Sequence, residues 1–553
     1  MSATNRDGTT QHDSHSSARV DKENEGPMQS SDITLRSESS SSSGEIDEED
    51  PEKNAGGTQN TDLERLERSM STPHSRKGHE EKAPEKDPNL VEWDGPDDPE
   101  NPQNMPKWRK WVLTMTLSSL TMWITFASSV FSTATLVTAK EYNVSTEVMT
   151  LATSLVVFGF AVGPLMWSPL SELYGRRIPL FSGYAIFAIF QIPVAVAQNV
   201  QTIMLCRFLM GVFGCSPLAV VGGAMADFWD PVDRAVAIAC FSAATFVGPV
   251  IGPIVGGFIT ESHLGWRWTA WITLIASASF GTFALFTVPE TYGPVILQKR
   301  AARLRRETGN WALHSFLDEH RPTASEIVTK YLLRPIQMLF LEPILLAMTI
   351  YLAFIYGILY LFFEAYPVSF EEVRGWTNGG VAGLPFLGIM IGVLCGVALI
   401  IWQTKTRFAR KLEKHGRVVP EERLVPMMIA SVLLPAGLFW FGWTSDPNIS
   451  WVPQVIAGVP IGMGILVIFM QGLNYIIDVY MMFANSAIAA NTLVRSGLGG
   501  AFPLFAVQMY HRLGVNWASS LLGFITVAMI PIPVVFFFYG AKIRAMSKFS
   551  PKF

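Results

Sequence analysis

The sequence predicts an all-α polytopic membrane protein in which twelve transmembrane helices form two bundles of six. Of the 553 residues, 49% are hydrophobic and only 16% are charged, and the mean hydropathy is positive. A soluble chain of this length would divide into several domains and would carry more charge. The apolar residues also fall into long runs, and roughly 20 apolar residues in a helix cross a hydrocarbon core about 30 Å thick.

Each apolar run is long enough to be one membrane span. The predicted spans are 110–132, 147–170, 179–197, 201–225, 235–260, 266–288, 341–364, 378–402, 425–443, 451–477, 484–508 and 518–541. They are predicted as helices because they lack the alternation of polar and apolar residues that barrel strands show.

Polar segments divide the chain into five parts. Residues 1–105 are of low complexity, and up to residue 106 the chain has 11 Lys and Arg against 25 Asp and Glu. Such a composition predicts a disordered acidic tail. We expect a first bundle over 106–289, a linker with a basic helical run over 290–340, a second bundle over 341–541 and a short basic end over 542–553. A capping-box spacing at 323–326 predicts a further helix start in the linker.

The distribution of basic residues predicts the orientation. If the N-terminus is cytoplasmic, the cytoplasmic segments after residue 106 hold 25 Lys and Arg, whereas the other side holds Lys140, Arg267, Arg374 and Arg512 alone. This asymmetry favours cytoplasmic N- and C-termini. The sequons at Asn143 and Asn448 fall in the predicted outer loops, so both are glycosylation candidates.

The two halves share a spacing. A glycine precedes an aspartate by 16 residues and another glycine follows that aspartate by 21 in each half: Gly211, Asp227 and Gly248 in the first, Gly462, Asp478 and Gly499 in the second. We therefore expect two repeats related by an axis along the membrane normal.

A turn with a distinctive order of residues joins the second and third spans. It contains Gly163, Glu172, Gly175, Arg176 and Arg177. The simpler interpretation is a tight turn held at the inner face by arginines. The order also resembles the loop motif of the major facilitator superfamily, and the resemblance implies an inner-gate role for these residues.

Arg207 lies inside the fourth span, where a charge is costly and is usually paired or functional. It resembles the superfamily's fourth-helix arginine, which implies a part in proton coupling, although pairing or snorkelling remains an equal alternative. The predicted first span contains no acidic residue, so the further candidates for proton coupling are Glu364, Asp478 and Asp227. The two aspartates also suit a structural role at the inner gate, since each is near a helix C-terminus.

The fifth span carries a glycine stripe with two prolines. The residues are Gly248, Pro249, Gly252, Pro253, Gly256 and Gly257. Glycines spaced by four permit close helix packing, and proline kinks a helix. The stripe resembles the fifth-helix motif of proton-coupled antiporters. Plain tight packing is the alternative.

Three further segments resemble the fungal twelve-span drug:proton antiporter family, whose members export drugs, polyamines or mycotoxins. They are residues 93–104, 289–292 and 495–505. For a substrate pocket the residue types suggest Tyr351, Tyr356, Tyr360, Gln471, Asn474, Asn491 and Arg495. Such a lining could hold an amphipathic or cationic ligand, and packing of the aromatic rings is the alternative.

The sequence therefore predicts a plasma-membrane transporter that exports a small molecule in exchange for protons. The alternatives are an uptake transporter on the same scaffold, a vacuolar location and a non-transporting sensor. The expected partners are a small-molecule substrate, protons and lipid, with no nucleic acid, and the protein is expected to work as a monomer. No nucleotide loop, metal cluster, cofactor site or catalytic triad is found. Cys206, Cys215, Cys240 and Cys395 are expected to be packing residues.

Overall fold

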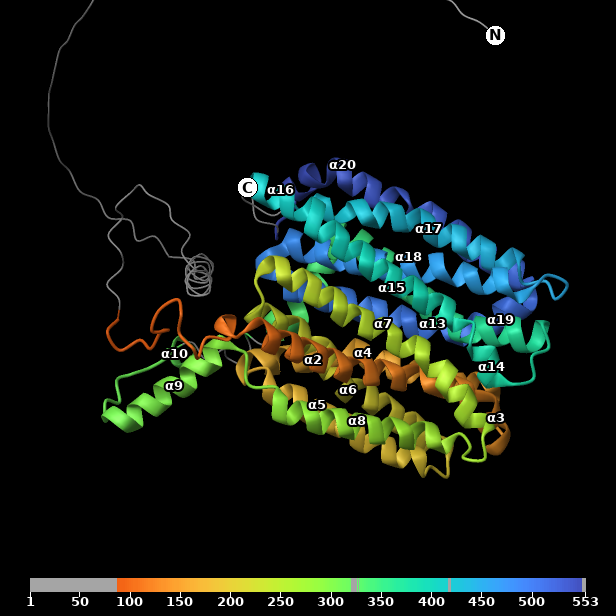
Figure 1. Cartoon of the computed structure of the whole chain (residues 1–553), viewed down its shortest axis with the longest axis horizontal. Coiled ribbons are helices and arrows are strands. Elements are labelled where there is room, and N and C mark those ends of the chain that lie inside the picture. Colours follow the sequence, from red (N-terminus) through yellow and green to blue (C-terminus); the bar gives the residue numbers. More distant parts are fainter. Residues whose placement is uncertain (1–86, 320–325, 327, 416–418, 550–553) are drawn as a thin grey trace, which may run out of the picture. The chain divides into compact units, whose positions relative to one another are not determined.

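The computed structural model describes residues 87–319, 326, 328–415 and 419–549. The predicted acidic tail up to residue 86 and the capping-box residue Thr323 lie outside the described residues. The compact unit to which the described residues belong is built from helices that run side by side (Figure 1).

The first half contains six long helices, as predicted. They are α2 (Lys107–Ser129), α4 (Thr146–Leu173), α5 (Arg177–Ala195), α6 (Val200–Phe228), α7 (Pro231–Glu261) and α8 (Arg267–Thr287). A 3-10 turn (Val130–Ala134) and α3 (Thr135–Glu141) extend α2. Mid-helix prolines in α4, α5, α6 and α7 are tolerated because neighbouring helices surround them.

The linker begins with α9 (Gly293–Thr308), which matches the predicted basic helical run, and continues through α10 (Phe316–Glu319). After a gap in the described residues come a π-helical turn (Thr329–Leu333) and α12 (Arg334–Leu341). The end of α9 follows from its sequence, because Gly309 adopts a left-handed conformation with φ of 68°.

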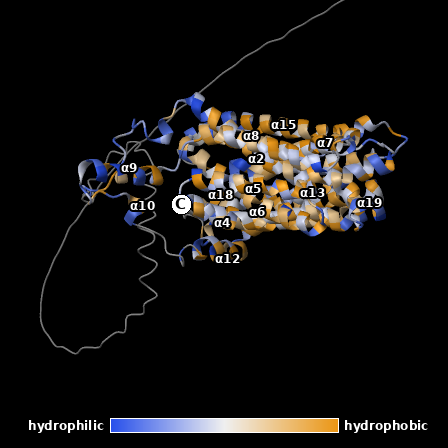
Figure 2. Ribbon diagram, turned by 90° about the horizontal axis from the view of Figure 1, so that it is seen from below, coloured by the Kyte–Doolittle hydropathy of each residue, from blue (hydrophilic) through white to orange (hydrophobic). Residues whose placement is uncertain are grey.

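The second half repeats the arrangement. Its long helices are α13 (Pro343–Pro367), α15 (Phe386–Gln403), α17 (Leu424–Trp443), α18 (Trp451–Tyr480) and α19 (Ala484–Met529), followed by α20 (Pro531–Ala545). The short helices α14 (Gly379–Gly383) and α16 (Ala409–His415) flank α15. Apolar residues dominate the bundle and hydrophilic residues gather at its two ends (Figure 2).

Among the described residues, eleven helical stretches are long and apolar enough to span a membrane, and the last of them, Ala484–Ala545, has 62 residues. A helix of that length would be about 93 Å long, far more than one bilayer needs. Gly514 interrupts it with φ of 74° and ψ of 161°. Beyond this break the Ser519 hydroxyl returns to 3.4 Å from the Tyr510 hydroxyl. The stretch therefore contains the predicted eleventh and twelfth spans as a hairpin.

The predicted repeat appears in the helix contacts. A Cβ atom on Gly211 of α6 would meet the Val156 backbone of α4, and one on Gly462 of α18 would meet the Ile389 backbone of α15. Gly248 of α7 likewise faces α2, and Gly499 of α19 faces α13. Glycines at matching positions thus bring matching helices together, because only a missing side chain lets the backbones approach.

Residues 87–105 differ from the predicted tail, because ion pairs attach them to α9. The Arg300 side chain binds Asp94 and donates to Asp98 at 2.6 Å, and Arg303 donates to Glu100 at 2.7 Å. Val91 and His314 also form a backbone hydrogen bond of 2.9 Å. The predicted boundary at residue 105 rested on composition, which does not reveal that charges 200 residues apart are complementary.

Candidate transport site

The end of the bundle that carries Arg176, Arg177, Arg423 and Arg544 is called the basic face. There the predicted loop motif is held by an ion pair, in which Arg176 Nε lies 3.0 Å from Asp227 Oδ2. The Arg176 guanidinium also lies 4.6 Å from the centre of the Tyr292 ring. Burial raises the pKa of the Tyr292 phenol to about 12. Asp227 therefore has a cation as its partner in this structure.

Glu290 completes this turn. Its carboxylate accepts hydrogen bonds from the backbone N–H groups of Arg176 at 2.8 Å and Arg177 at 3.2 Å. A carboxylate at the start of α5 satisfies free N–H groups and interacts favourably with the helix dipole. Sequence reasoning noted the segment 289–292 only as a family resemblance and assigned Glu290 no role. The signal available was an acidic residue in the segment that follows the sixth span.

Glu172 connects the two halves. Its carboxylate accepts hydrogen bonds from Asn485 of α19 at 2.9 Å and from Lys330 of the linker at 3.0 Å, and it also accepts one from the Tyr331 hydroxyl. Glu172 was expected to pair with an arginine of its own turn or with a neighbouring helix end. Asn485 lies at the start of α19, so a neighbouring helix end is among its partners, and all three partners come from beyond the first half.

The second half has its own ion pair at the basic face. Arg423 lies just before α17, and its Nε atom is 2.9 Å from the Oδ2 atom of Asp478 at the end of α18. The turn after α15 lacks the glutamate and glycine of the first-half motif. Glu422 supplies an acid there from later in the chain and lies 2.7 Å from Arg407.

The glycine stripe of α7 packs directly on α2. A Cβ atom on Gly256 would lie 2.6 Å from the Val130 carbonyl oxygen, and one on Gly248 would collide with Thr125. Gly257 faces the other half, where its Cβ would lie 2.6 Å from the Gly379 carbonyl oxygen. Close packing of this stripe is thus established, and it includes a contact between the halves.

Arg207 is 2% exposed and has no carboxylate partner among the described residues. Its Nε donates to the Ala152 carbonyl at 2.7 Å, and one terminal nitrogen lies 3.4 and 3.3 Å from the carbonyls of Ala127 and Ser128. Those two carbonyls lie where α2 gives way to a 3-10 turn. The guanidinium also stacks 4.5 Å from the Phe131 ring centre.

Three of the predicted substrate residues come together at the centre. Tyr360 and Tyr356 are 3.5 Å apart at their hydroxyls, and the Tyr360 hydroxyl is 3.1 Å from Ser128 of the first half. The Arg495 guanidinium lies 4.8 Å from the Tyr356 ring centre and 4.9 Å from that of Phe469. We call Ser128, Tyr360, Tyr356, Arg495 and Phe469 the central row.

The other predicted substrate residues have different neighbours. Tyr351 is buried in α13, and Asn491 donates to Thr349 at 3.3 Å. Gln471 is fully buried, and neither its side-chain oxygen nor its nitrogen has a hydrogen-bond partner. Asn474 is half-buried in α18. Sequence reasoning missed Ser128 and Phe469, since a serine and a phenylalanine inside apolar runs give no signal.

Glu364 is 7% exposed and forms no ion pair within the described part of the chain. Its Oε1 atom is buried without a hydrogen-bond partner. It lies one turn beyond Tyr360 on α13. It therefore differs from Asp227 and Asp478, which each face an arginine.

The halves also meet at the end of the bundle away from the basic face, which we call the opposite face. Glu261 of α7 accepts a hydrogen bond from the Gly379 backbone of the second half. Asn143 and Asn448 are exposed at this face. Since the halves touch at both ends, a solute at the centre would need one end to part.

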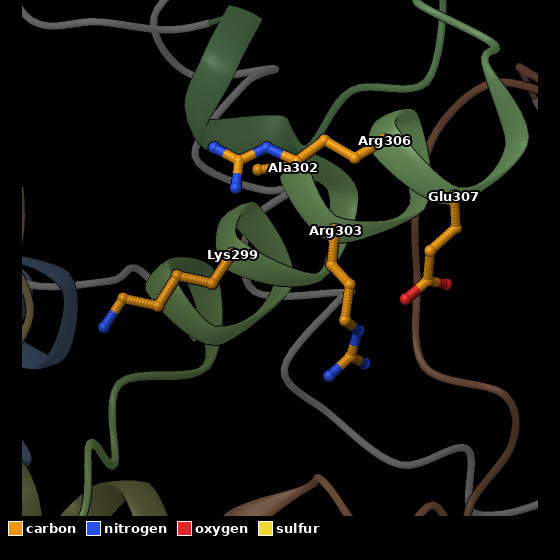
Figure 3. Close-up of a pocket in the computed structure, with 5 residues that line it drawn as sticks. All are labelled: Lys299, Ala302, Arg303, Arg306 and Glu307. Atoms are coloured by element: carbon orange, nitrogen blue, oxygen red, sulfur yellow. The ribbon is translucent and has the colours of Figure 1, made fainter.

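A surface groove on α9 is separate from these residues. Its lining consists of Lys299, Ala302, Arg303, Arg306 and Glu307 (Figure 3). It belongs to the linker and contains no predicted site residue.

Comparisons with known proteins give the family. The family model described as Major Facilitator Superfamily matches residues 113–504. The citrinin biosynthesis cluster MFS transporter of Monascus ruber is 66% identical over 463 residues, which cover 84% of this chain and 93% of that protein. The ascochitine biosynthesis cluster MFS transporter of Didymella fabae is 59% identical over 469 residues, covering 85% and 91%.

A solved structure supports the fold. The proton:xylose symporter XylE, bound to 6-bromo-6-deoxy-D-glucose, superimposes with a TM-score of 0.55 at 14% identity and covers 78% of this chain and 96% of its own. The expected twelve-helix architecture is thereby confirmed. The chain belongs to the major facilitator superfamily and is an integral membrane transporter of small molecules, not an enzyme.

Proposed function

We propose that the protein exports a small secondary metabolite or toxin across the plasma membrane in exchange for protons, by alternating access. The export direction is supported by relatives that are named as transporters of the citrinin and ascochitine biosynthesis clusters. A cluster that makes a toxic product benefits from its removal. The packed glycine stripe of α7, with its contact to Gly379, supports a gate between the halves.

The observation that carries proton coupling is the environment of Glu364. A carboxylate buried without a cation is costly unless it is protonated. Asp227 and Asp478 are ion-paired at the basic face, so we assign them to closure of that face and not to proton transfer. We therefore propose Glu364 as the proton carrier.

The test compares wild type with Glu364→Gln, which keeps the shape of the side chain and removes its charge. Export of a metabolite panel is followed in transporter-deficient yeast with matched surface levels, with and without a protonophore. Wild type should lower accumulation, and the protonophore and Glu364→Gln should each abolish this effect. Glu413→Gln, the same change on exposed α16, serves as the control. Higher accumulation with wild type would instead establish uptake.

Substrate counterflow in vesicles separates coupling from binding. Exchange of labelled for unlabelled substrate needs no net proton movement, so Glu364→Gln should retain it. Loss of counterflow together with export would assign Glu364 to binding or folding and would remove it as the proton carrier.

The proposed orientation places the basic face in the cytoplasm, with both termini, and leaves the opposite face outside. Asn143→Gln and Asn448→Gln should then each remove a glycan and increase the electrophoretic mobility, unless the loop of Asn448 is too short to be modified. Substitution of Ser145 is a poorer test, because its hydroxyl also accepts a hydrogen bond from Val148 at the start of α4. We propose the monomer as the transporting unit, since all the residues assigned here belong to one chain.

A further inference from the structure

Among the described residues, no carboxylate pairs with the two arginines inside the bundle. Arg207 and Arg495 both lie within membrane-spanning helices, and within the described residues neither forms an ion pair with a carboxylate. The predicted first span, which faces Arg207 through its Ala127 and Ser128 carbonyls, holds no acid. A cation in the membrane interior is normally paired or assigned to a substrate pathway.

The two arginines differ in how they are satisfied. Arg207 donates to three backbone carbonyls through Nε and one terminal nitrogen, so it is anchored within the first half. Arg495 donates no hydrogen bond within the described structure, and its Nε is buried without a partner. Its guanidinium rests only on the faces of Tyr356 and Phe469. Arg495 therefore has free donors at the place where the halves meet.

The rings around Arg495 form an aromatic wall that crosses between the halves. Tyr356 and Phe469 stack with ring centres 6.0 Å apart, and Phe469 meets Phe246 of α7 edge-on at 5.1 Å. The Tyr360 hydroxyl contacts Ser128 of α2 on the other side. A flat ligand that entered when the halves part would find ring faces and a guanidinium fork together.

We infer that the transported compound is an aromatic anion, whose carboxylate binds Arg495 and whose ring stacks on Tyr356 and Phe469. Guanidinium binds a carboxylate through two parallel hydrogen bonds and also stacks on rings, which matches both features of this place. The bound anion supplies the counter-charge that Arg495 lacks among the described residues. The sequence had suggested an amphipathic or cationic ligand, and the uncompensated arginine favours an amphipathic anion over a cation.

This inference rests on the proposed function for the direction of movement, but the charge preference can be measured without transport. The full-length protein is purified in lipid nanodiscs, and calorimetry measures the binding of 1-naphthoate, 1-naphthamide and 1-naphthylmethylammonium. These three share a ring system and differ in charge. The naphthoate should bind about tenfold or more tightly than the other two, since a charge-assisted hydrogen bond contributes that much.

Variants assign the preference to one side chain. Arg495→Gln should abolish the preference for naphthoate, and Arg495→Lys should retain part of it because the charge remains without the fork. Arg267→Gln removes the same charge from the opposite face, where Arg267 pairs with Glu141, and should change nothing. Unchanged thermal unfolding of Arg495→Gln would show that the variant is folded.

Each outcome decides the inference. Equal binding of the three probes, binding of none, or an unchanged preference in Arg495→Gln overturns it. If one of these outcomes is found and the protein still exports neutral or cationic compounds in exchange for protons, the proposed function holds and the preference for an anion is refuted. A naphthoate preference that depends on Arg495 in a protein that shows no proton-coupled export supports the anion and refutes the antiport.

Discussion

Asp478 at the end of α18 faces Arg423 at a distance of 2.9 Å, and Asp227 at the end of α6 faces Arg176 at 3.0 Å in the equivalent position of the first half. In both pairs the acid ends a helix and the arginine precedes the neighbouring helix. Each carboxylate lies near the negative end of a helix dipole. The dipole would disfavour this negative charge if no cation lay beside it. The two pairs therefore hold corresponding turns in the two bundles.

Asp478→Asn should destabilise the protein by about 3 kcal/mol, because removal of one partner leaves a buried charge uncompensated. The side chains of Arg423 and Asp478 are only 9% and 14% exposed. The control is Asp233→Asn, which breaks a pair with Lys107 in which the side chains are 39% and 79% exposed and should cost less than about 1 kcal/mol. Thermal unfolding in detergent compares them, and equal losses would contradict the role given to burial.

Gly256→Ala should weaken the contact of α7 with the 3-10 turn that extends α2, and should slow transport. The new methyl group would lie 2.6 Å from the Val130 carbonyl and 2.7 Å from the Thr133 hydroxyl, so one helix must move. Overpacking of this kind costs about 1–3 kcal/mol. Gly222→Ala is the matched control, since nothing lies within 4 Å of its Cβ, and alanine should stabilise that helix by up to about 1 kcal/mol. Export at matched surface level and melting temperature are the measurements.

Glu290→Ala should destabilise the turn before α5 by about 1–2 kcal/mol, the usual cost of losing a helix cap. The N–H groups of Arg176 and Arg177 would lose their acceptor. Glu290→Gln retains one acceptor oxygen and should lose less. Glu307→Ala, on the exposed end of α9, should change the free energy of unfolding by less than about 0.5 kcal/mol. Unfolding of the three variants in one detergent ranks them, and a neutral Glu290→Ala would refute the capping role.

Attachment of residues 87–105 to α9 and α10 should depend on pH in two directions. Burial would raise the pKa of Asp98, but hydrogen bonds from the Asp94 backbone and Arg300 outweigh it and lower the pKa below 3.8. The stabilisation of the attachment by Asp98 is therefore complete above pH 3.8 and is lost as the pH falls through the lowered pKa. A hydrogen bond to the Ala312 backbone, assisted by Glu319 and Asp87, raises the pKa of His314 above 6.5. The stabilisation by His314 is complete below pH 6.5 and is lost as the pH rises through the raised pKa.

Hydrogen exchange at Val91 measures this attachment, because its amide donates to the His314 carbonyl. Exchange, corrected for its intrinsic pH dependence, should be slowest between those limits and should accelerate toward higher pH. His314→Gln should remove the acceleration on the alkaline side alone. An unaltered profile in that variant would assign the pH dependence to other groups.

The sequence predicted the spans, their division into two bundles and the repeat, because hydrophobic length and glycine spacing are local properties. The loop motif and glycine stripe were also recognisable from residue order. Contacts between distant segments were not recognisable from the sequence. The structure alone reveals the hydrogen bonds of Glu290 with Arg176, of Asn485 with Glu172 and of Ser128 with Tyr360. The surroundings of Arg495 were hidden for the same reason, since the sequence shows the arginine but not which described residues lie around it.

The reversal at Gly514 has a mechanical consequence. Because the chain reverses direction at Gly514 alone, no loop separates the span that carries Arg495 from the span that follows it. At the far end of that second span, Arg544 lies 2.9 Å from Glu421, next to the residue pair that holds the basic face of the second half. If transport tilts the span that carries Arg495, we therefore expect the Arg544–Glu421 ion pair at the basic face to move with it.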